Sequence, residues 1–194
     1  MRVDSTPPSW HPLQIVKILA VALTLAASSL TSVGPLGELT DLAVERVQVA
    51  DLVAAAKFGT TQPIDDPARE QQVLDTVRTK ATALGLNPEN AARFFRAQIE
   101  ANKLVQRGLY ARWTEHPEEV PQRRPDLGTE VRPILDRLTT EILAELKDTE
   151  RLRKPTLKCE IHATIAERSA VVLHHLDRLH ENALAEAMRT VCSE

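Results

Sequence analysis

The sequence predicts an all-α protein, a single-domain helical bundle of about six helices preceded by a signal peptide. Glycine is scarce, with 6 residues in 194, and aromatic residues make up only 3% of the chain. Strands favour aromatic and β-branched residues and tight hairpins need glycine, so this composition is unfavourable for an all-β fold. Beyond the first thirty residues, apolar side chains recur in steps of three and four, which is the spacing of one helical face.

The charge balance limits the classes of function. The chain has 24 basic and 27 acidic side chains, a formal net charge of −3, and 43% apolar residues. These values are typical of a soluble globular protein. A general nucleic-acid-binding protein usually has a strong basic excess, so no nucleic-acid partner is predicted. A small cationic pocket remains compatible with this balance.

Residues 1–33 are predicted to be a secretory signal peptide. Residues 18–30 read ILAVALTLAASSL and carry no charge, and Lys17 precedes them. A basic start, a short apolar run and a small-residue exit define such a signal, and the run is too short to span a bilayer comfortably. An uncleaved membrane anchor and a buried helix are the alternatives. We therefore expect a mature domain over 34–194 that is secreted or periplasmic, without stable membrane association.

The cysteine content agrees with export. Cys159 and Cys192 are the two cysteines of the chain and lie 33 positions apart. In an oxidising compartment such a pair usually forms a disulfide, which would stabilise the fold by about 3–4 kcal/mol. Two buried free thiols are the alternative. No metal site is predicted, because His162 alone cannot complete one and the adjacent His174 and His175 would point in different directions on a helix.

Three helices are predicted in the first half of the mature chain, over residues 37–57, 66–85 and 87–113. Asp66 and Asn87 each precede a proline. An Asp or Asn side chain can accept hydrogen bonds from the free amides of a first helical turn, and proline suits the first helical position. These two dipeptides therefore mark helix starts, and the glycine at the end of the second segment marks a helix end.

The second half of the chain is predicted to contain three more helices. Residues 116–128 contain three prolines and cannot be helical throughout. A fourth helix is expected over 129–151, which requires Pro133 to fall in its first turn. Residues 155–191 are expected to form two helices with a break near His174–His175.

The observation that points to function is that several polar residues lie on the apolar faces of the predicted helices. They are Arg46, Lys57, Arg69, Asn102, Gln106 and Arg132. Arg46 and Lys57 are eleven residues apart, which places them on one helical face with about 16 Å between them along the axis. Asn102 and Gln106 are four residues apart and lie one above the other on another inward face.

Three interpretations of these inward cations are open. They could extend to the surface, pair with acidic residues inside the bundle, or line a cavity that holds an anion. For four cations and two amides on several helices, we favour a shared anionic ligand. It would be small and carry at least two negative groups, since arginine matches carboxylates bidentately.

The region from Arg46 to Gln106 resembles the all-helical chorismate mutases of the AroQ class, in particular their secreted gamma subtype. The segment ERVQVADLVAAAKFGTTQPIDDPARE contains Arg46, Lys57, Asp66, Arg69 and Glu70 at the spacing of that family. The segments QIEANKLVQRGLYARW and DLGTEVRPILDRL contain Asn102, Gln106 and Arg132. The cysteine pair also resembles that of the secreted subtype, which has a disulfide near its C-terminus.

The resemblance implies an isomerase that rearranges chorismate to prephenate in an intramolecular Claisen reaction. Neither a cofactor, a metal nor a covalent intermediate is implied. Catalysis would come from holding a compact, reactive conformer of the substrate and from stabilising charge on its ether oxygen. The resemblance also implies a homodimer.

The resemblance further assigns roles to individual residues. Arg46 and Arg132 would clamp the substrate carboxylates, with Arg69 in support. Lys57 and Gln106 would donate hydrogen bonds to the ether oxygen from opposite sides. Some secreted members have a glutamate where this chain has Gln106, and a glutamate must be protonated to donate. We therefore expect little loss of turnover between mildly acidic and neutral pH.

Three further residues would complete the substrate pocket. By the same resemblance, Asp66 and Glu70 lie near the ring hydroxyl and Asn102 lines the pocket. The alternative function is a non-enzymatic exported helical bundle that binds a small dicarboxylate. It would account for the signal peptide, the cysteines and the apolar stripes, but not for the convergence of cations and amides.

Overall fold

The computed structural model describes residues 32–193, and every regular element in that part of the chain is a helix. The six α-helices are α1 (Gly37–Lys57), α2 (Pro67–Ala83), α3 (Pro88–Glu115), α4 (Arg132–Asp148), α5 (Leu157–Leu173) and α6 (Arg178–Met188). The predicted fold class and number of helices are confirmed. The predicted signal peptide falls almost entirely outside the described residues and stays a prediction. Among the described helices, none has the length and apolar character needed to cross a membrane.

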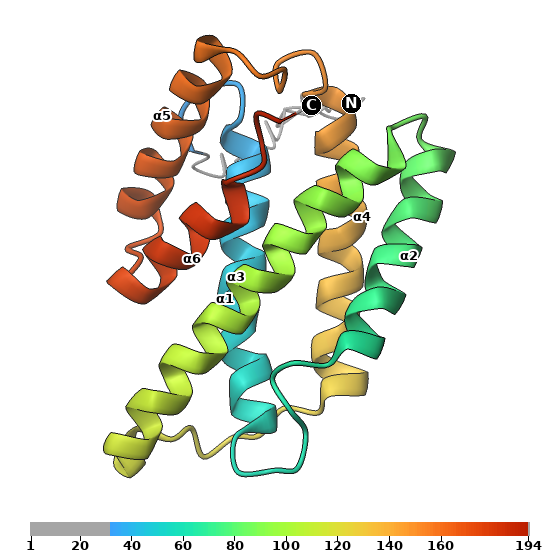
Figure 1. Cartoon of the computed structure of the whole chain (residues 1–194). Coiled ribbons are helices and arrows are strands. Elements are labelled where there is room, and N and C mark those ends of the chain that lie inside the picture. The colour runs from blue at the N-terminus through green and yellow to red at the C-terminus, as the bar shows by residue number, and fades with distance from the viewer. Residues whose placement is uncertain (1–31, 194) are drawn as a thin grey trace, which may run out of the picture.

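Helix α1 lies at the centre of the bundle and contacts four of the other five helices. Helices α2 and α4 lie on one side of it, α5 and α6 on the other, and α3 runs diagonally across it (Figure 1). The main core forms between these elements and includes the fully buried Leu39, Phe95, Leu138, Ile142 and Leu146. On α4, Leu135 is only half-buried, because it lines the cavity described below.

The predicted helix starts are confirmed by hydrogen bonds at both caps. The Asp66 carboxylate accepts a hydrogen bond from the Arg69 amide at 3.0 Å, at the start of α2. The Asn87 side-chain oxygen accepts from the amides of the two residues after Pro88, at the start of α3. Helix α2 ends just before Gly85, whose φ of +69° lies in the left-handed region that glycine tolerates.

The fourth helix begins differently from the prediction. Residues Leu127–Val131 form a wide π-helical turn, and the α-helix proper begins only at Arg132. The Asp126 side chain caps this turn by accepting from the Thr129 amide at 2.7 Å. Pro133 lies in the first turn of α4, as the prediction required, and its missing N–H prevents a regular helical bond back into that turn.

The C-terminal helices are tied together as the sequence predicted. Helix α5 ends at Leu173, and the chain turns at His175, whose φ of +51° is left-handed. Cys159 and Cys192 form a disulfide across a separation of 33 residues. The alternative of two free thiols is therefore wrong, and the bond joins the first turn of α5 to the tail that follows α6.

Two histidines attach the α5–α6 hairpin to α1. His174 Nε2 lies 2.8 Å from Asp41 Oδ1, and His180 Nε2 lies 2.9 Å from Asp51 Oδ1. The other ring nitrogen of His180 lies 2.7 Å from Asp177 Oδ1 at the start of α6. The hydrogen bond to Asp51, together with Asp177 and against the effect of burial, raises the pKa of His180 to about 9.

The His180 contacts predict a fall in stability at alkaline pH. The folded-state pKa of about 9 exceeds the usual value of 6.5, so the stabilisation is complete below about pH 6.5 and is lost as the pH rises towards 9. We expect His180→Asn to remove this part of the pH dependence in urea unfolding. The exposed His116, which lies 3.4 Å from the nearby Glu118, provides the control variant His116→Asn. Equal pH dependence in wild type and His180→Asn would contradict the assignment.

Candidate active site

A cavity of about 380 Å³ lies between α1, α2, α3 and α4 and the loop that joins α1 to α2. Its volume falls in the range of small-molecule sites. One chain supplies all eight residues predicted from the sequence, which are Arg46, Lys57, Asp66, Arg69, Glu70, Asn102, Gln106 and Arg132. The structure therefore brings the whole predicted set together around one space.

Arg46 is the buried cation of this cavity. It projects from α1, with its guanidinium carbon 5.5 Å from the centre of the Phe95 ring, and its Nη1 donates to the Leu135 carbonyl at 3.3 Å. Its Nε is buried, and no group in the described part of the chain accepts a hydrogen bond from it. Burial lowers the pKa of Arg46 to about 10, with Asp136 opposing, so it stays charged at neutral pH. A buried charge with a spare donor is suited to binding an anion.

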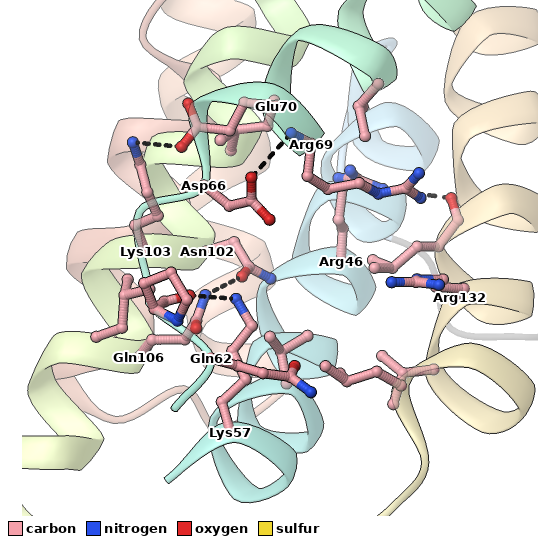
Figure 2. A pocket seen from close by; sticks show the side chains of 18 of the residues that line it. Arg46, Lys57, Gln62, Asp66, Arg69, Glu70, Asn102, Lys103, Gln106 and Arg132 are labelled. Atoms are coloured by element: carbon pink, nitrogen blue, oxygen red, sulfur yellow. Dashed lines mark hydrogen bonds and ion pairs between the residues drawn. The ribbon is translucent and has the colours of Figure 1, made fainter. Parts of the chain in front are cut away.

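Arg69 and Arg132 lie at the mouth of the cavity and are exposed. Figure 2 shows both on the same side of the pocket as Arg46. Arg69 lines the cavity together with Val73 of the same helical face, as predicted, but its side chain is exposed. Each of the two arginines is in the first turn of its helix, at the edge of the bundle, where solvent reaches the side chain.

Lys57 is the last residue of α1 and is half-buried. Its ammonium donates to the Pro63 carbonyl at 2.9 Å, in the loop that follows α1. Burial lowers the pKa of Lys57, while the carboxylates of Asp66, Asp65 and Glu70 act in the opposite direction. One hydrogen bond leaves ammonium protons available to a ligand in the cavity.

The two predicted amides lie on the wall formed by α3. Gln106 is buried, and its Nε2 donates to Asn102 Oδ1 at 2.7 Å (Figure 2). Because an amide nitrogen carries two hydrogens, Gln106 keeps one donor for a ligand. Its Oε1 is buried and accepts no hydrogen bond within residues 32–193. This pair therefore presents hydrogen-bond donors to the side of the cavity opposite the arginines.

The acidic residues of the cavity have different surroundings. Asp66 caps α2, so its carboxylate is fixed at the loop end of the site. Glu70 accepts from Arg96 Nη1 at 2.6 Å and from Lys103 Nζ at 3.2 Å. Both partners come from α3, so Glu70 joins α2 to α3 beside the cavity.

Four polar lining residues were not among the predicted site residues, namely Gln62, Lys103, Asp136 and Thr139. Gln62 belongs to an irregular loop, where no periodic pattern indicates the direction of a side chain. Lys103 lies three residues before Gln106 and shares its helical face, and this spacing is the signal that identifies it. Its burial also agrees with an inward position.

The cavity combines cations with hydrogen-bond donors in a way that fits a small dianion. Guanidinium groups on one side can hold carboxylates, and the ammonium and amides on the other can donate to a neutral or partly charged oxygen. Within residues 32–193, no group of three or more His, Cys, Asp or Glu side chains is arranged to hold a metal ion.

Comparison with known proteins identifies the family. The family described as chorismate mutase type II matches residues 37–107, from the start of α1 into α3. The secreted chorismate mutase of Mycobacterium tuberculosis is 30% identical over 193 residues, which cover 94% of this chain and 96% of the relative. The chain belongs to the type II chorismate mutase family. It is thus a chorismate mutase, an isomerase, as the sequence analysis predicted.

Two other relatives agree with this membership. The secreted chorismate mutase of Mycolicibacterium smegmatis is 33% identical, with 81% of this chain and 86% of the relative covered. The crystal structure of chorismate mutase from Burkholderia phymatum superimposes with a TM-score of 0.77 at 34% identity, covering 82% of this chain and 97% of that one. The mycobacterial relatives are named as secreted enzymes, which is consistent with the gamma subtype expected for this chorismate mutase.

Proposed function

We propose that this chorismate mutase acts by restraining its substrate in a compact conformer and by stabilising negative charge on the breaking ether oxygen. In this reaction one carbon–oxygen bond breaks while one carbon–carbon bond forms within the same molecule, and no proton has to move. The observation that carries the proposal is the convergence of the four predicted cations and the two predicted amides on one cavity of about 380 Å³. Such fixed charges act without reorganising during the reaction.

The arginines hold the substrate carboxylates in this proposal. Arg46 is fixed by the Phe95 ring and the Leu135 carbonyl, and its buried Nε supports a role in binding an anion. Arg132 and Arg69 bind the second carboxylate at the mouth of the cavity, where both side chains are exposed. Planar guanidinium groups bind carboxylates through paired hydrogen bonds, which fix the orientation of the substrate.

Lys57 and Gln106 stabilise the ether oxygen. They come from different walls of the cavity, α1 and α3, so they can donate to one oxygen from two sides. The cationic donor contributes most where charge develops in the transition state. Asp66, Glu70 and Asn102 complete the pocket, with the two carboxylates close to the ring hydroxyl.

The direct test is the turnover of chorismate by the purified mature chain. We expect the absorbance of chorismate to fall and prephenate to form at a rate proportional to the amount of enzyme. If chorismate raised the melting temperature without being consumed, the chain would instead be a dicarboxylate-binding bundle, and the proposed mechanism would be wrong.

Export and a homodimer are further parts of the proposal. Secreted relatives and the apolar segment near the N-terminus support export. We expect the full chain to be recovered outside the cytoplasm and shorter by about 30 residues. Because one chain supplies all eight predicted site residues, we expect activity per chain to persist when dilution separates the subunits of a dimer.

The amide at Gln106 predicts how activity depends on pH. The wild-type rate is expected to change little between about pH 5 and pH 7.5, because an amide donates at either pH. In Gln106→Glu the new carboxyl must be protonated to donate, so activity near pH 7.5 is expected to fall about a hundredfold and to recover in acid. The control Gln106→Met loses the donor at every pH. A wild-type rate that collapses over this range would exclude Gln106 as the donor.

A further inference from the structure

We propose that Lys103, assisted by Arg96, is a positioning residue that fixes the Glu70 carboxylate as the acceptor for the ring hydroxyl of the substrate. Through Glu70, it gives the enzyme a preference for substrates that carry this hydroxyl. The inference rests on the proposed function and adds a residue to which the sequence analysis gave no role.

The geometry holds Glu70 at both carboxylate oxygens. Lys103 Nζ lies 3.2 Å from Oε1, and Arg96 Nη1 lies 2.6 Å from Oε2. The side chains of Lys103 and Glu70 are only 10% and 14% exposed, so water screens their contact weakly. Two donors on different oxygens fix both the position and the plane of the carboxylate. Each oxygen keeps a second lone pair, so Glu70 can still accept from a hydroxyl in the cavity.

Lys103 is itself held away from the position of a carboxylate clamp. Besides Glu70, its ammonium lies 2.8 Å from Glu100 Oε1 and 3.4 Å from Asp65 Oδ1. Figure 2 shows the Lys103 ammonium directed towards Glu70, on the side of the pocket opposite the labelled arginines. Three carboxylates surround this cation, so it does not compete with the arginines for the substrate. Its action on the reaction therefore passes through Glu70.

The pKa shifts of the two pocket lysines, Lys103 and Lys57, have opposite directions. Burial acts to lower the pKa of Lys103, but the hydrogen bonds to Glu100 and Glu70 outweigh it and raise the pKa. For Lys57, burial outweighs its neighbouring carboxylates and lowers the pKa. Lys103 is thus already satisfied by protein carboxylates, whereas Lys57 keeps donors for a ligand.

The test compares Lys103→Met with wild type on two substrates, chorismate and an analogue in which hydrogen replaces the ring hydroxyl. We expect Lys103→Met to lower kcat/KM for chorismate about tenfold and to leave the analogue within about twofold of wild type. Lys103→Arg keeps a donor to Glu70 and is expected to restore most of the preference for chorismate. Arg107→Met is the control, because Arg107 lies on the same helix and pairs with Asp65 but not with Glu70.

A double-variant cycle separates positioning from a direct contact. Glu70→Ala is expected to lower kcat/KM for chorismate as much as Lys103→Met, and combining the two is expected to cost little more than either alone. Additive losses, or equal losses for chorismate and the analogue in Lys103→Met, would overturn the inference. Lack of turnover by the wild-type enzyme would overturn the proposed function instead, so the two failures are distinguishable.

Discussion

Replacing Lys57 by methionine is expected to lower kcat/KM for chorismate by about three orders of magnitude. Loss of one hydrogen-bond donor to a developing negative charge typically costs about 10²–10³ in rate, and a charged donor lies at the upper end of that range. Methionine has nearly the length of lysine but cannot donate. The loss is expected mainly in kcat, because the ether oxygen gains its charge only in the transition state. Steady-state kinetics by chorismate absorbance measures it.

The fold is expected to survive this substitution. In the free enzyme Lys57 makes its hydrogen bond to the Pro63 carbonyl in an exposed loop, so its loss leaves that carbonyl to water. Lys80→Met provides a matched control, since Lys80 hydrogen-bonds to Thr140 between α2 and α4 and does not line the cavity. If Lys57→Met kept more than about a tenth of the wild-type kcat with an unchanged helical signal, Lys57 would not be the donor to the ether oxygen.

The helices of this chain were predictable because their starts are encoded locally. Asp66 and Asn87 bond to amides two or three residues away, and such contacts depend on sequence neighbours alone. The π-helical turn at Leu127–Val131 was not predictable in this way. It depends on the cap at Asp126 together with the missing amide of Pro133, and on packing against α1. The sequence pattern therefore placed the helix but not the form of its first turn.

The partners of the histidines show a second limit of sequence reasoning. His174 and His180 bond to Asp41 and Asp51, which lie more than a hundred positions earlier in the chain. No local pattern indicates contacts of that kind, so the sequence argued only against a metal site. The structure gives these histidines a role in attaching α5 and α6 to α1.

The sequence was a better guide to which residues line the candidate site than to how exposed each of them is. Six of the eight predicted residues were placed on inward faces by their helical spacing, and such residues converge on the space between the helices, which explains why they line one cavity. Asp66 and Glu70 were expected there only from the resemblance to the family. Exposure was less predictable, because Arg69 and Arg132 occupy first turns at the edge of the bundle. Lys103 was missed although its spacing from Gln106 places it on the same helical face, because the carboxylates that compensate its buried charge become known only from the fold.

Replacing Arg46 by methionine is expected to abolish most activity while preserving or raising the melting temperature. Loss of a buried charge that pairs with a ligand costs about 2–5 kcal/mol, which corresponds to about thirtyfold to several thousandfold in kcat/KM. In the free enzyme the same buried charge destabilises the fold, as shown by the burial that lowers the pKa of Arg46 to about 10. Methionine removes this charge and fills much of the same volume.

The contacts that Arg46 leaves behind explain why the fold should tolerate its loss. The Leu135 carbonyl still accepts from Thr139 Oγ1 at 2.7 Å, and the Phe95 ring keeps its apolar neighbours in the core. Kinetics and thermal unfolding on one preparation test both halves of the prediction. A large fall in melting temperature together with lost activity would make Arg46 a structural residue. If the variant loses activity but unfolds at the wild-type temperature or above it, the Arg46 charge serves substrate binding and does not stabilise the fold.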